Sequence, residues 1–276
     1  MIPPNTVSRD YSVHGDACRR WLLRELEALG QPAFPDYSRF LTAMAEFALA
    51  SVAPGTPRPW AESVASILKD RCDREKIAAL FDATPESVTV CGWLSLLFLI
   101  HEIPPPVSLD RLQRRLHLMV ARPVDSPYPL RRLEAAYLLH RLGHVTALPF
   151  SWPIRRSADF VSGVYELTHA AFYLSDFAAN GWPVGSDVLR QSRSGMLESL
   201  RPAIRFCEWT AHLDLSAEVA LAGFGLGCAG EIANLLDMVA REQDRRGMVT
   251  ETGGPRSPSL VHQTLAAMLA FDASRM

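Results

Sequence analysis

The chain has 276 residues, enough to bury a large hydrophobic core as one large domain or two small ones, so stability requires neither disulfide bonds nor a structural metal. Its residues are 48% hydrophobic and 21% charged, as in an ordinary soluble globular protein, and the formal net charge is only −2. A charge this small gives no general attraction to nucleic acid or to an anionic membrane, so we expect neither as a partner.

Cysteine usage and the absence of targeting signals predict a cytoplasmic protein. The five cysteines are an odd set with no Cys-x-x-Cys pair, which indicates neither a disulfide framework nor a structural zinc site. The N-terminus lacks the basic region and apolar run of a signal peptide, and the longest uncharged apolar run, Val88–Ile100, is too short to cross a bilayer. Among the 28 basic residues only Lys69 and Lys76 are lysine, a bias that indicates a GC-rich bacterial genome.

Helical periodicity, interrupted by Pro and Gly, predicts helices through the first half of the chain. Gly30 supplies a natural stop for the first of them. Thr84, Pro85 and Glu86 match an N-cap, a first-turn proline and a first-turn acid, which predicts the start of a very hydrophobic helix there. These helices are expected over residues 14–29, 37–52, 60–80 (one helix or two), 84–100, 108–121 and 130–142.

The second half of the chain follows the same pattern. We expect helices over residues 159–180, 193–212, 216–246 and 260–274, with Pro202 either kinking the second or marking its start and Ser216 capping the third. No stretch alternates with period two, so the sequence predicts an all-α protein. Short Pro- and Gly-containing connections favour antiparallel helical hairpins, here in a single domain over residues 1–276 with an irregular lead over residues 1–12.

One hairpin resembles a known architecture. The phrase LLDMVAREQDRRG, residues 235–247, places a Gln-x-x-x-Gly turn after a helix and is similar to the α/α toroids of terpene cyclases and protein prenyltransferases. This resemblance implies a toroid, or part of one, with a central cavity lined by inner helices. It does not imply the chemistry of those enzymes, because the Asp-rich terpene-cyclase motifs and a prenyltransferase zinc set are both absent from the sequence.

The predicted helix over residues 159–180 carries the leading candidates for catalysis. At 100° per residue a set of polar side chains falls in one arc, with Asp159 beside them. No Lys or Arg occurs from residue 157 to 189, which favours a partly buried groove over a solvated face, although a solvated or structurally satisfied face is the alternative. The arc contains Ser162, Glu166, His169, Tyr173 and Asp176.

Glu166 or Asp176 is expected to orient His169 as a general base or acid, with Tyr173 donating a hydrogen bond. Glu166 and His169 also form a Glu-x-x-His pair as in di-iron bundles, but those bundles need a second such motif. The helix with Glu134, His140 and His144 does not provide it. We therefore expect neither a metal nor another cofactor.

Four further residues are candidates for substrate binding. They are Glu231, Asn234, His262 and His140. Glu231 and Asn234 adjoin a glycine-lined face of the predicted 216–246 helix, which would place the segment GFGLGCAG inside a helix and exclude a phosphate-binding loop. Close packing of small residues is the alternative reading of that face, and a satisfied core histidine is the alternative for His262.

These features predict a cofactor-independent enzyme of bacterial specialised metabolism, such as antibiotic biosynthesis, that uses general acid–base catalysis on a small molecule in a central cavity. Cyclisation and elimination are the reactions we consider. The sequence contains no P-loop, dinucleotide-binding, nucleophile-elbow or His-Glu-x-x-His motif. The alternative is a non-catalytic helical protein that binds or stabilises a partner protein or forms a homo-oligomer, which would present an exposed apolar patch.

Overall fold

A computed structural model describes residues 10–30, 37–121, 129–144, 159–179, 187–249 and 258–276. Over these ranges the protein is all-α, as predicted, and has no strand beyond an isolated bridge between Gln243 and Val249. The helices are α1 Ser12–Ala28, α2 Tyr37–Val52, α3 Arg58–Arg71, α4 Arg74–Ala83, α5 Ser87–Ile100, α6 Leu109–Val120, α7 Pro129–Arg141, α8 Phe160–Leu174, α9 Asp187–Thr210, α10 Leu213–Gly225, α11 Ala229–Arg241 and α12 Pro258–Ala273.

The chain divides into two compact units. The N-terminal unit spans Leu23–Arg155, and the C-terminal unit combines Met1–Leu22 with Arg156–Met276. In the N-terminal unit the apolar sequence of α5 explains its central place, because nearly every side chain from Ser87 to Phe98 is buried against neighbouring helices. Helices α2, α3, α4, α6 and α7 all pack on α5.

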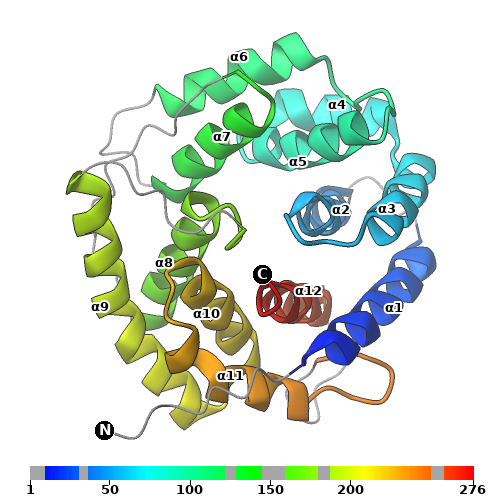
Figure 1. Ribbon diagram of the computed structural model, residues 1–276. Coiled ribbons are helices and arrows are strands. Elements are labelled where there is room, and N and C mark those ends of the chain that lie inside the picture. Colours follow the sequence, from blue (N-terminus) through cyan, green and yellow to red (C-terminus); the bar gives the residue numbers. More distant parts are fainter. Residues whose placement is uncertain (1–9, 31–36, 122–128, 145–158, 180–186, 250–257) are drawn as a thin grey trace, which may run out of the picture. The chain divides into compact units, whose positions relative to one another are not determined.

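Helix α10 has the corresponding place in the C-terminal unit. Its sequence, LDLSAEVALAGFG, is apolar nearly all round, and α8, α9, α11 and α12 pack against it (Figure 1). Its two acidic residues, Asp214 and Glu218, are therefore surrounded by other helices instead of water, and both are buried. This placement positions the site described below.

Two predicted helices have different limits in the structure. Residues 60–80 form two helices, and Asp73 begins the second by accepting a hydrogen bond at Oδ1 from the Lys76 N–H at 3.1 Å. The hydrophobic helix α5 begins at Ser87 and not at the predicted Thr84 cap, since Thr84 ends α4. Pro202 neither starts nor ends a helix, because α9 continues through it.

The prediction of a single helix over residues 216–246 is wrong. The chain forms α10 and α11 with a turn between them, where Gly227 has φ +74° and the Cys228 N–H donates to the Gly223 carbonyl at 2.9 Å. This is a Schellman-type helix end, which favours glycine because the left-handed conformation crowds a Cβ atom. GFGLGCAG therefore spans a turn between two helices and does not lie inside one helix.

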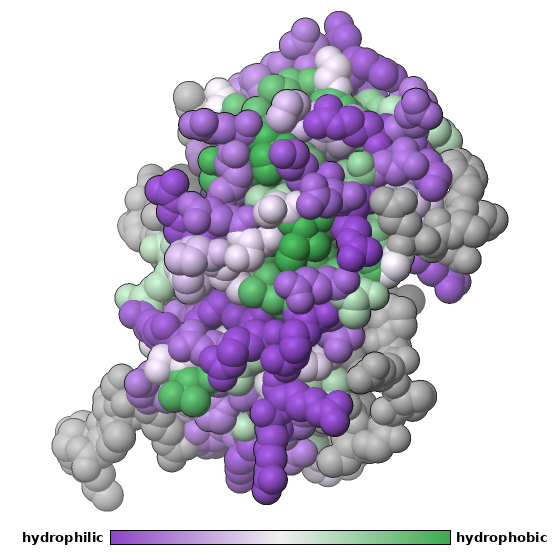
Figure 2. All heavy atoms as spheres, turned by 90° about the vertical axis from the view of Figure 1, so that its right-hand side faces the viewer, coloured by the Kyte–Doolittle hydropathy of each residue, from purple (hydrophilic) through white to green (hydrophobic). Residues whose placement is uncertain are grey.

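Most large apolar side chains are buried. The face of the molecule in Figure 2 is mainly hydrophilic, and hydrophobic residues reach it only in small areas. Among the described residues, no helix combines the length and apolar character needed to cross a membrane. The exposed large apolar side chains in the described ranges are Val13, Leu99, Ile100, Leu118, Phe160, Trp209 and Met276.

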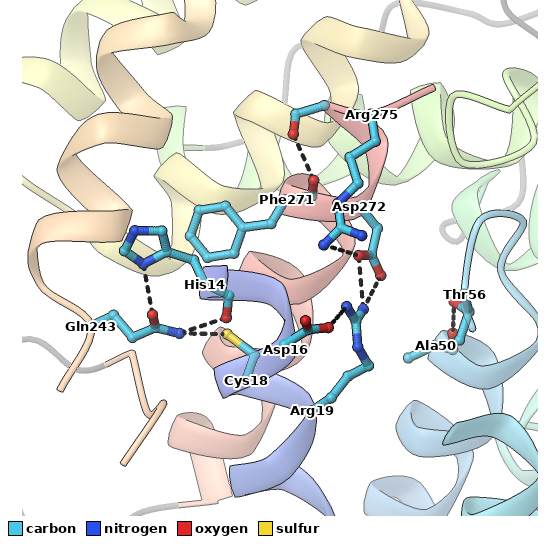
Figure 3. A network of polar contacts seen from close by, with 11 residues as sticks. His14, Asp16, Cys18, Arg19, Ala50, Thr56, Gln243, Phe271, Asp272 and Arg275 are labelled. Atoms are coloured by element: carbon cyan, nitrogen blue, oxygen red, sulfur yellow. Dashed lines mark hydrogen bonds and ion pairs between the residues drawn. The ribbon is translucent and has the colours of Figure 1, made fainter. Parts of the chain in front are cut away.

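A buried ion pair joins α1 to α12 within the C-terminal unit. Arg19 points from α1 toward Asp272 (Figure 3), and its Nη1 donates to both carboxylate oxygens at 2.8 and 2.7 Å. Asp16 accepts from the other terminal nitrogen of Arg19 at 2.5 Å. Beside this pair, the Gln243 side chain bonds to His14 and Cys18 of α1, so polar contacts join α1 both to α12 and to the segment that follows α11.

We expect Asp272→Asn to lower the free energy of unfolding by about 3 kcal/mol, because the change leaves a buried guanidinium without its main counter-charge. Urea denaturation measures the loss. The matched control is Glu62→Gln, which breaks the exposed pair between Arg58 and Glu62 and should change stability little. Equal effects of the two substitutions would contradict a stabilising role for the buried pair.

Ala211 offers a test of the connection that leads into α10. It is exposed and has φ +54°, a conformation that costs an L-residue about 1 kcal/mol or more. Ala211→Gly should therefore raise the free energy of unfolding by about 0.5 kcal/mol. The same change at exposed Ala233 inside α11 should lower it by about 1 kcal/mol, so thermal unfolding of the two variants should shift in opposite directions.

Candidate functional site

Six polar side chains meet between α8, α10 and α12 inside the C-terminal unit. We call them the Glu218 cluster, after the acid at its centre. Side chains three or four positions apart lie on the same face of a helix. Helix α8 therefore contributes Tyr165, Thr168 and His169 from one face, and α10 contributes its two acids, four positions apart, from one face. The cluster consists of Tyr165, Thr168, His169, Asp214, Glu218 and His262.

Glu218 is only 1% exposed and receives partners from two helices. Thr168 donates its hydroxyl to Oε2 at 2.5 Å, and His262 Nε2 lies 3.1 Å from Oε1. His169 Nδ1 lies 3.7 Å from Oε2. Burial alone raises the pKa of Glu218, but the charge of His169, the hydrogen bond and charge of His262, and the Thr168 hydroxyl together hold this pKa below its usual range. Glu218 is therefore a carboxylate at neutral pH.

The hydrogen bonds of His169 define which of its nitrogens carries the proton. Nδ1 is 2.8 Å from the main-chain carbonyl oxygen of Tyr165, and a carbonyl can only accept, so Nδ1 must carry the hydrogen. In the neutral ring the lone pair is then on Nε2, which has no hydrogen-bond partner among the described residues. The side chain is 28% exposed, so a buried carboxylate supports one edge of the imidazole while part of the ring reaches the surface.

Asp214 forms the other end of the cluster. Its Oδ2 accepts the Tyr165 hydroxyl hydrogen at 2.5 Å, while buried Oδ1 has no hydrogen bond to any described residue and lies 3.8 Å from His262 Nε2. Burial raises the pKa of Asp214 above its ordinary value, despite the nearby charge of His262 and the hydrogen bond from Tyr165. The pKa values of the two acids of α10 are thus shifted in opposite directions: that of Asp214 is raised and that of Glu218 is lowered. Glu218 is therefore the acid that loses its proton more readily.

The structure brings His169 and His262 together, but it arranges the other predicted catalytic residues differently. Glu166 is half-buried and makes no hydrogen bond to any described residue, so the carboxylate beside His169 comes from α10 and not from α8. Tyr173 is buried with its ring edge-on to Phe177 at 6.1 Å. Asp176 lies beyond the end of α8 with φ +50°.

The remaining residues of the predicted arc lie at the start of α8. Asp159 caps the helix by accepting the Ser162 N–H at 2.8 Å, and Ser162 itself is exposed. The connection after α8, where the predicted helix would continue, has left-handed backbone at three successive residues, and residue 180 lies outside the described ranges. The polar arc therefore ends with the helix.

The other predicted binding residues are at the surface. Glu231 pairs with Arg201 at 3.2 Å, and the Asn234 amide donates to Glu208 at 3.1 Å, in both cases between exposed side chains of α11 and α9. His140 is exposed on α7 and belongs to the N-terminal unit. Of the four residues, only His262 contributes to the Glu218 cluster.

Four members of the cluster did not emerge from the sequence: Tyr165, Thr168, Asp214 and Glu218. The signal for the last two was present, since an Asp and a Glu four residues apart share one face of an otherwise apolar helix. A charged residue in such a position is rarely buried without a partner. Among the described residues, no three His, Cys, Asp or Glu side chains are arranged to hold a metal ion together.

Comparison with family models identifies one match over most of the chain. A model described as a domain of unknown function, DUF6895, matches residues 16–264. The chain belongs to the DUF6895 family. The matched span contains all six residues of the Glu218 cluster, so the site lies within the family's domain. Comparisons with curated proteins and with solved structures gave no match.

We expect Glu218→Gln to lower the free energy of unfolding at pH 7 by about 2 kcal/mol, because an amide cannot replace the charge that the two histidines face. The folded protein holds the pKa of Glu218 below the value of about 4.3 in unfolded chains. Its stabilising contribution is therefore complete above that pH and is lost as the pH falls through the folded pKa.

Chemical denaturation of the wild type and Glu218→Gln between pH 3 and pH 7 measures this contribution. The difference between the two proteins should shrink as the solution becomes more acidic than about pH 4.3. Glu166→Gln is the matched control, because Glu166 is a half-buried acid in the same unit without these partners, and its effect should be small at every pH. A constant loss for Glu218→Gln across the range would contradict the carboxylate's role.

Proposed function

We propose that the protein is an enzyme that transfers protons on a small-molecule substrate, with His169 as its general base. The single observation that carries the proposal is the environment of His169. A main-chain carbonyl fixes the proton on Nδ1, a buried carboxylate stands 3.7 Å from the same nitrogen, and the ring is part-exposed. This arrangement orients a base and stabilises the cation that it becomes.

The proposed step begins with neutral His169. Nε2 takes a proton from the substrate, so that a substrate C–H or O–H bond breaks and an N–H bond forms. The ring becomes an imidazolium whose charge is balanced by Glu218. The same group then returns the proton to solvent or to the product, and the balance of atoms requires no other reactant.

The wider proposal is that this chemistry serves a cyclisation or an elimination in specialised metabolism, on a substrate held in the central cavity of an α/α toroid. The turn that suggested the resemblance to these toroids is formed, because the Gln243 amide donates to the Gly247 carbonyl at 3.2 Å and closes the Gln-x-x-x-Gly turn. The same amide reaches the His14 carbonyl of α1 at 3.0 Å, so the motif also joins two helices.

A second candidate is a non-catalytic protein that binds another protein. The observation that favours it is a group of aromatic side chains on the surface of the C-terminal unit. Trp209 of α9 is 85% exposed, and the rings of Phe160 and Phe206 pack at 5.1 Å one helical turn away from it. Exposed aromatic residues are typical anchors of protein interfaces.

The enzyme proposal can be tested before the substrate is known. The purified protein is incubated in D2O with a small-molecule extract of its source organism, and mass spectrometry follows compounds that gain deuterium from solvent. The wild type should label at least one compound. His169→Asn should reduce the rate at least a hundredfold, because an asparagine amide can replace the Nδ1 donor but not the basic Nε2.

His117→Asn is the matched control, since His117 is exposed on α6 of the N-terminal unit. Labelling by His169→Asn at the wild-type rate would reject the role of His169. Native mass spectrometry separates the two candidate functions. A retained small molecule that is lost in His169→Asn and kept in Trp209→Ser supports the enzyme, whereas a bound protein with the opposite dependence supports the binding function.

A further inference from the structure

We infer that Glu166 selects the substrate, and that it selects a molecule with a positively charged amine or ammonium group attached to an apolar body. The inference rests on the proposed function, because it gives the substrate class of the site that contains His169. Glu166 acts by holding the charged group beside the imidazole, and it takes no part in the transfer of the proton.

Glu166 and His169 lie on one face of α8. Side chains three positions apart share a face, and helical side chains lean toward the N-terminus of their helix. His169 Nδ1 is 2.8 Å from the Tyr165 carbonyl oxygen, so the imidazole leans over the turn from which Glu166 projects. Toward the C-terminal end of α8 the ring meets Phe172, with 5.5 Å between the ring centroids. The proposed base therefore lies between a carboxylate and an aromatic ring.

Among the described residues, the carboxylate of Glu166 has no partner. It forms no ion pair with His169, whose acidic partner is Glu218, and it makes no hydrogen bond. The side chain is half-buried, so water solvates its charge only in part. An acid in such a position gains more from an approaching cation than a fully exposed acid does, because the surrounding protein screens the charge less than water.

The three helices that form the site carry no fixed positive charge. No Lys or Arg occurs in residues 157–189, 206–240 or 257–274, the stretches that include α8, α10 and α12. Asp and Glu, in contrast, occur in all three stretches. A cation that matches Glu166 is thus missing from these helices, and a bound ligand can supply it through charge-assisted hydrogen bonds.

Asp214 provides a second acceptor that lacks a donor. Tyr165, the neighbour of Glu166 in sequence, donates to its Oδ2 at 2.5 Å, but buried Oδ1 receives no hydrogen bond from any described residue. Asp214 is only 9% exposed, and burial raises the pKa of its carboxyl group above the ordinary value. A positive charge bound nearby would favour the carboxylate form of Asp214, and the ligand would gain affinity in return.

These observations define the substrate class by its charge. An amine or ammonium group donates hydrogen bonds to a carboxylate and balances its charge, whereas a carboxylate or phosphate group would meet like charges in the site. Phe172 beside the imidazole and the half-buried Tyr165 give the surroundings an aromatic character, which favours an apolar body next to the cation. The site therefore prefers amines and rejects anions.

Binding is tested with two probes of similar size and opposite charge, phenethylammonium and 3-phenylpropionate. A titration followed by saturation-transfer NMR at pH 7 measures the affinity of each probe for the wild-type protein. Phenethylammonium should bind at least about fivefold more tightly than 3-phenylpropionate, and Glu166→Gln should weaken its binding about fivefold. Equal affinities of the two probes for the wild type would overturn the inference.

Reversal of the charge gives a sharper test. Glu166→Lys should bind 3-phenylpropionate more tightly than phenethylammonium, because the variant places a cation where the carboxylate was. The matched control is Glu198→Gln, which removes the same charge from an exposed position on α9 and should leave both affinities unchanged. Thermal unfolding shows whether each variant is folded. A wild-type preference that persists in folded Glu166→Gln would overturn the inference, whether or not Glu166→Lys folds.

The D2O experiment tests the same residue on the substrate itself. Ion exchange divides the small-molecule extract into cationic, neutral and anionic compounds, and the labelled compound should come from the cationic fraction. Glu166→Gln should raise the concentration needed for half-maximal labelling about fivefold and change the maximal rate less than about twofold. His169→Asn should instead lose the rate, because it removes the base.

The two experiments separate failure of this inference from failure of the proposed function. Labelling confined to neutral or anionic compounds would overturn the role of Glu166 and leave His169 as the base. Selective binding of phenethylammonium that depends on Glu166, without labelling of any compound, would support the cation site and reject the enzyme.

Discussion

The burial of one carboxylate, that of Glu218, is the constraint on which the architecture of the C-terminal unit depends. An ion moved from water into a protein interior costs several kcal/mol unless charged or hydrogen-bonding partners replace the water. Here Thr168 and His169 from α8 and His262 from α12 provide these partners. Helices α8 and α12 must therefore lie against α10 in one register, because a shift by one residue would turn these side chains away from the acid.

Other buried acids in the protein follow the same rule with a different kind of partner. In the C-terminal unit, Asp272 receives Arg19, and in the N-terminal unit Glu134 accepts from Trp93 at 2.8 Å and from Arg131 at 2.9 Å. A guanidinium stays protonated at any physiological pH and an indole N–H does not ionise, so these acids have partners of fixed charge. Glu218 differs because its nitrogen partners are imidazoles, a side chain that can both bind and release a proton. This difference is why the Glu218 cluster, and not the other two, is the candidate for proton transfer.

The helices were largely predictable from sequence because their signals are local. Apolar periodicity and Pro or Gly breaks placed α2 and α7 nearly to the residue. The turn at Gly227 was missed because glycine is tolerated inside helices as well as at their ends, and only the tertiary structure selects the left-handed conformation there. That error had a consequence for the site. With a helix assumed to start at Ser216, Asp214 was left outside it, and the relation between Asp214 and Glu218 was not recognised.

The site was only half predictable, for a reason that lies in helix geometry. Periodicity shows which residues share a face of α8, but which face meets α10 depends on packing with helices far away in the sequence. The face of α8 that includes Tyr165, Thr168 and His169 is turned about the helix axis from the predicted polar arc. His169 belongs to the face and to the arc, because it lies at the edge where they meet. A network that served packing alone would be no more stable than well-packed apolar side chains of similar volume. The cluster instead keeps two part-exposed imidazoles beside a buried carboxylate, an arrangement that packing alone does not require.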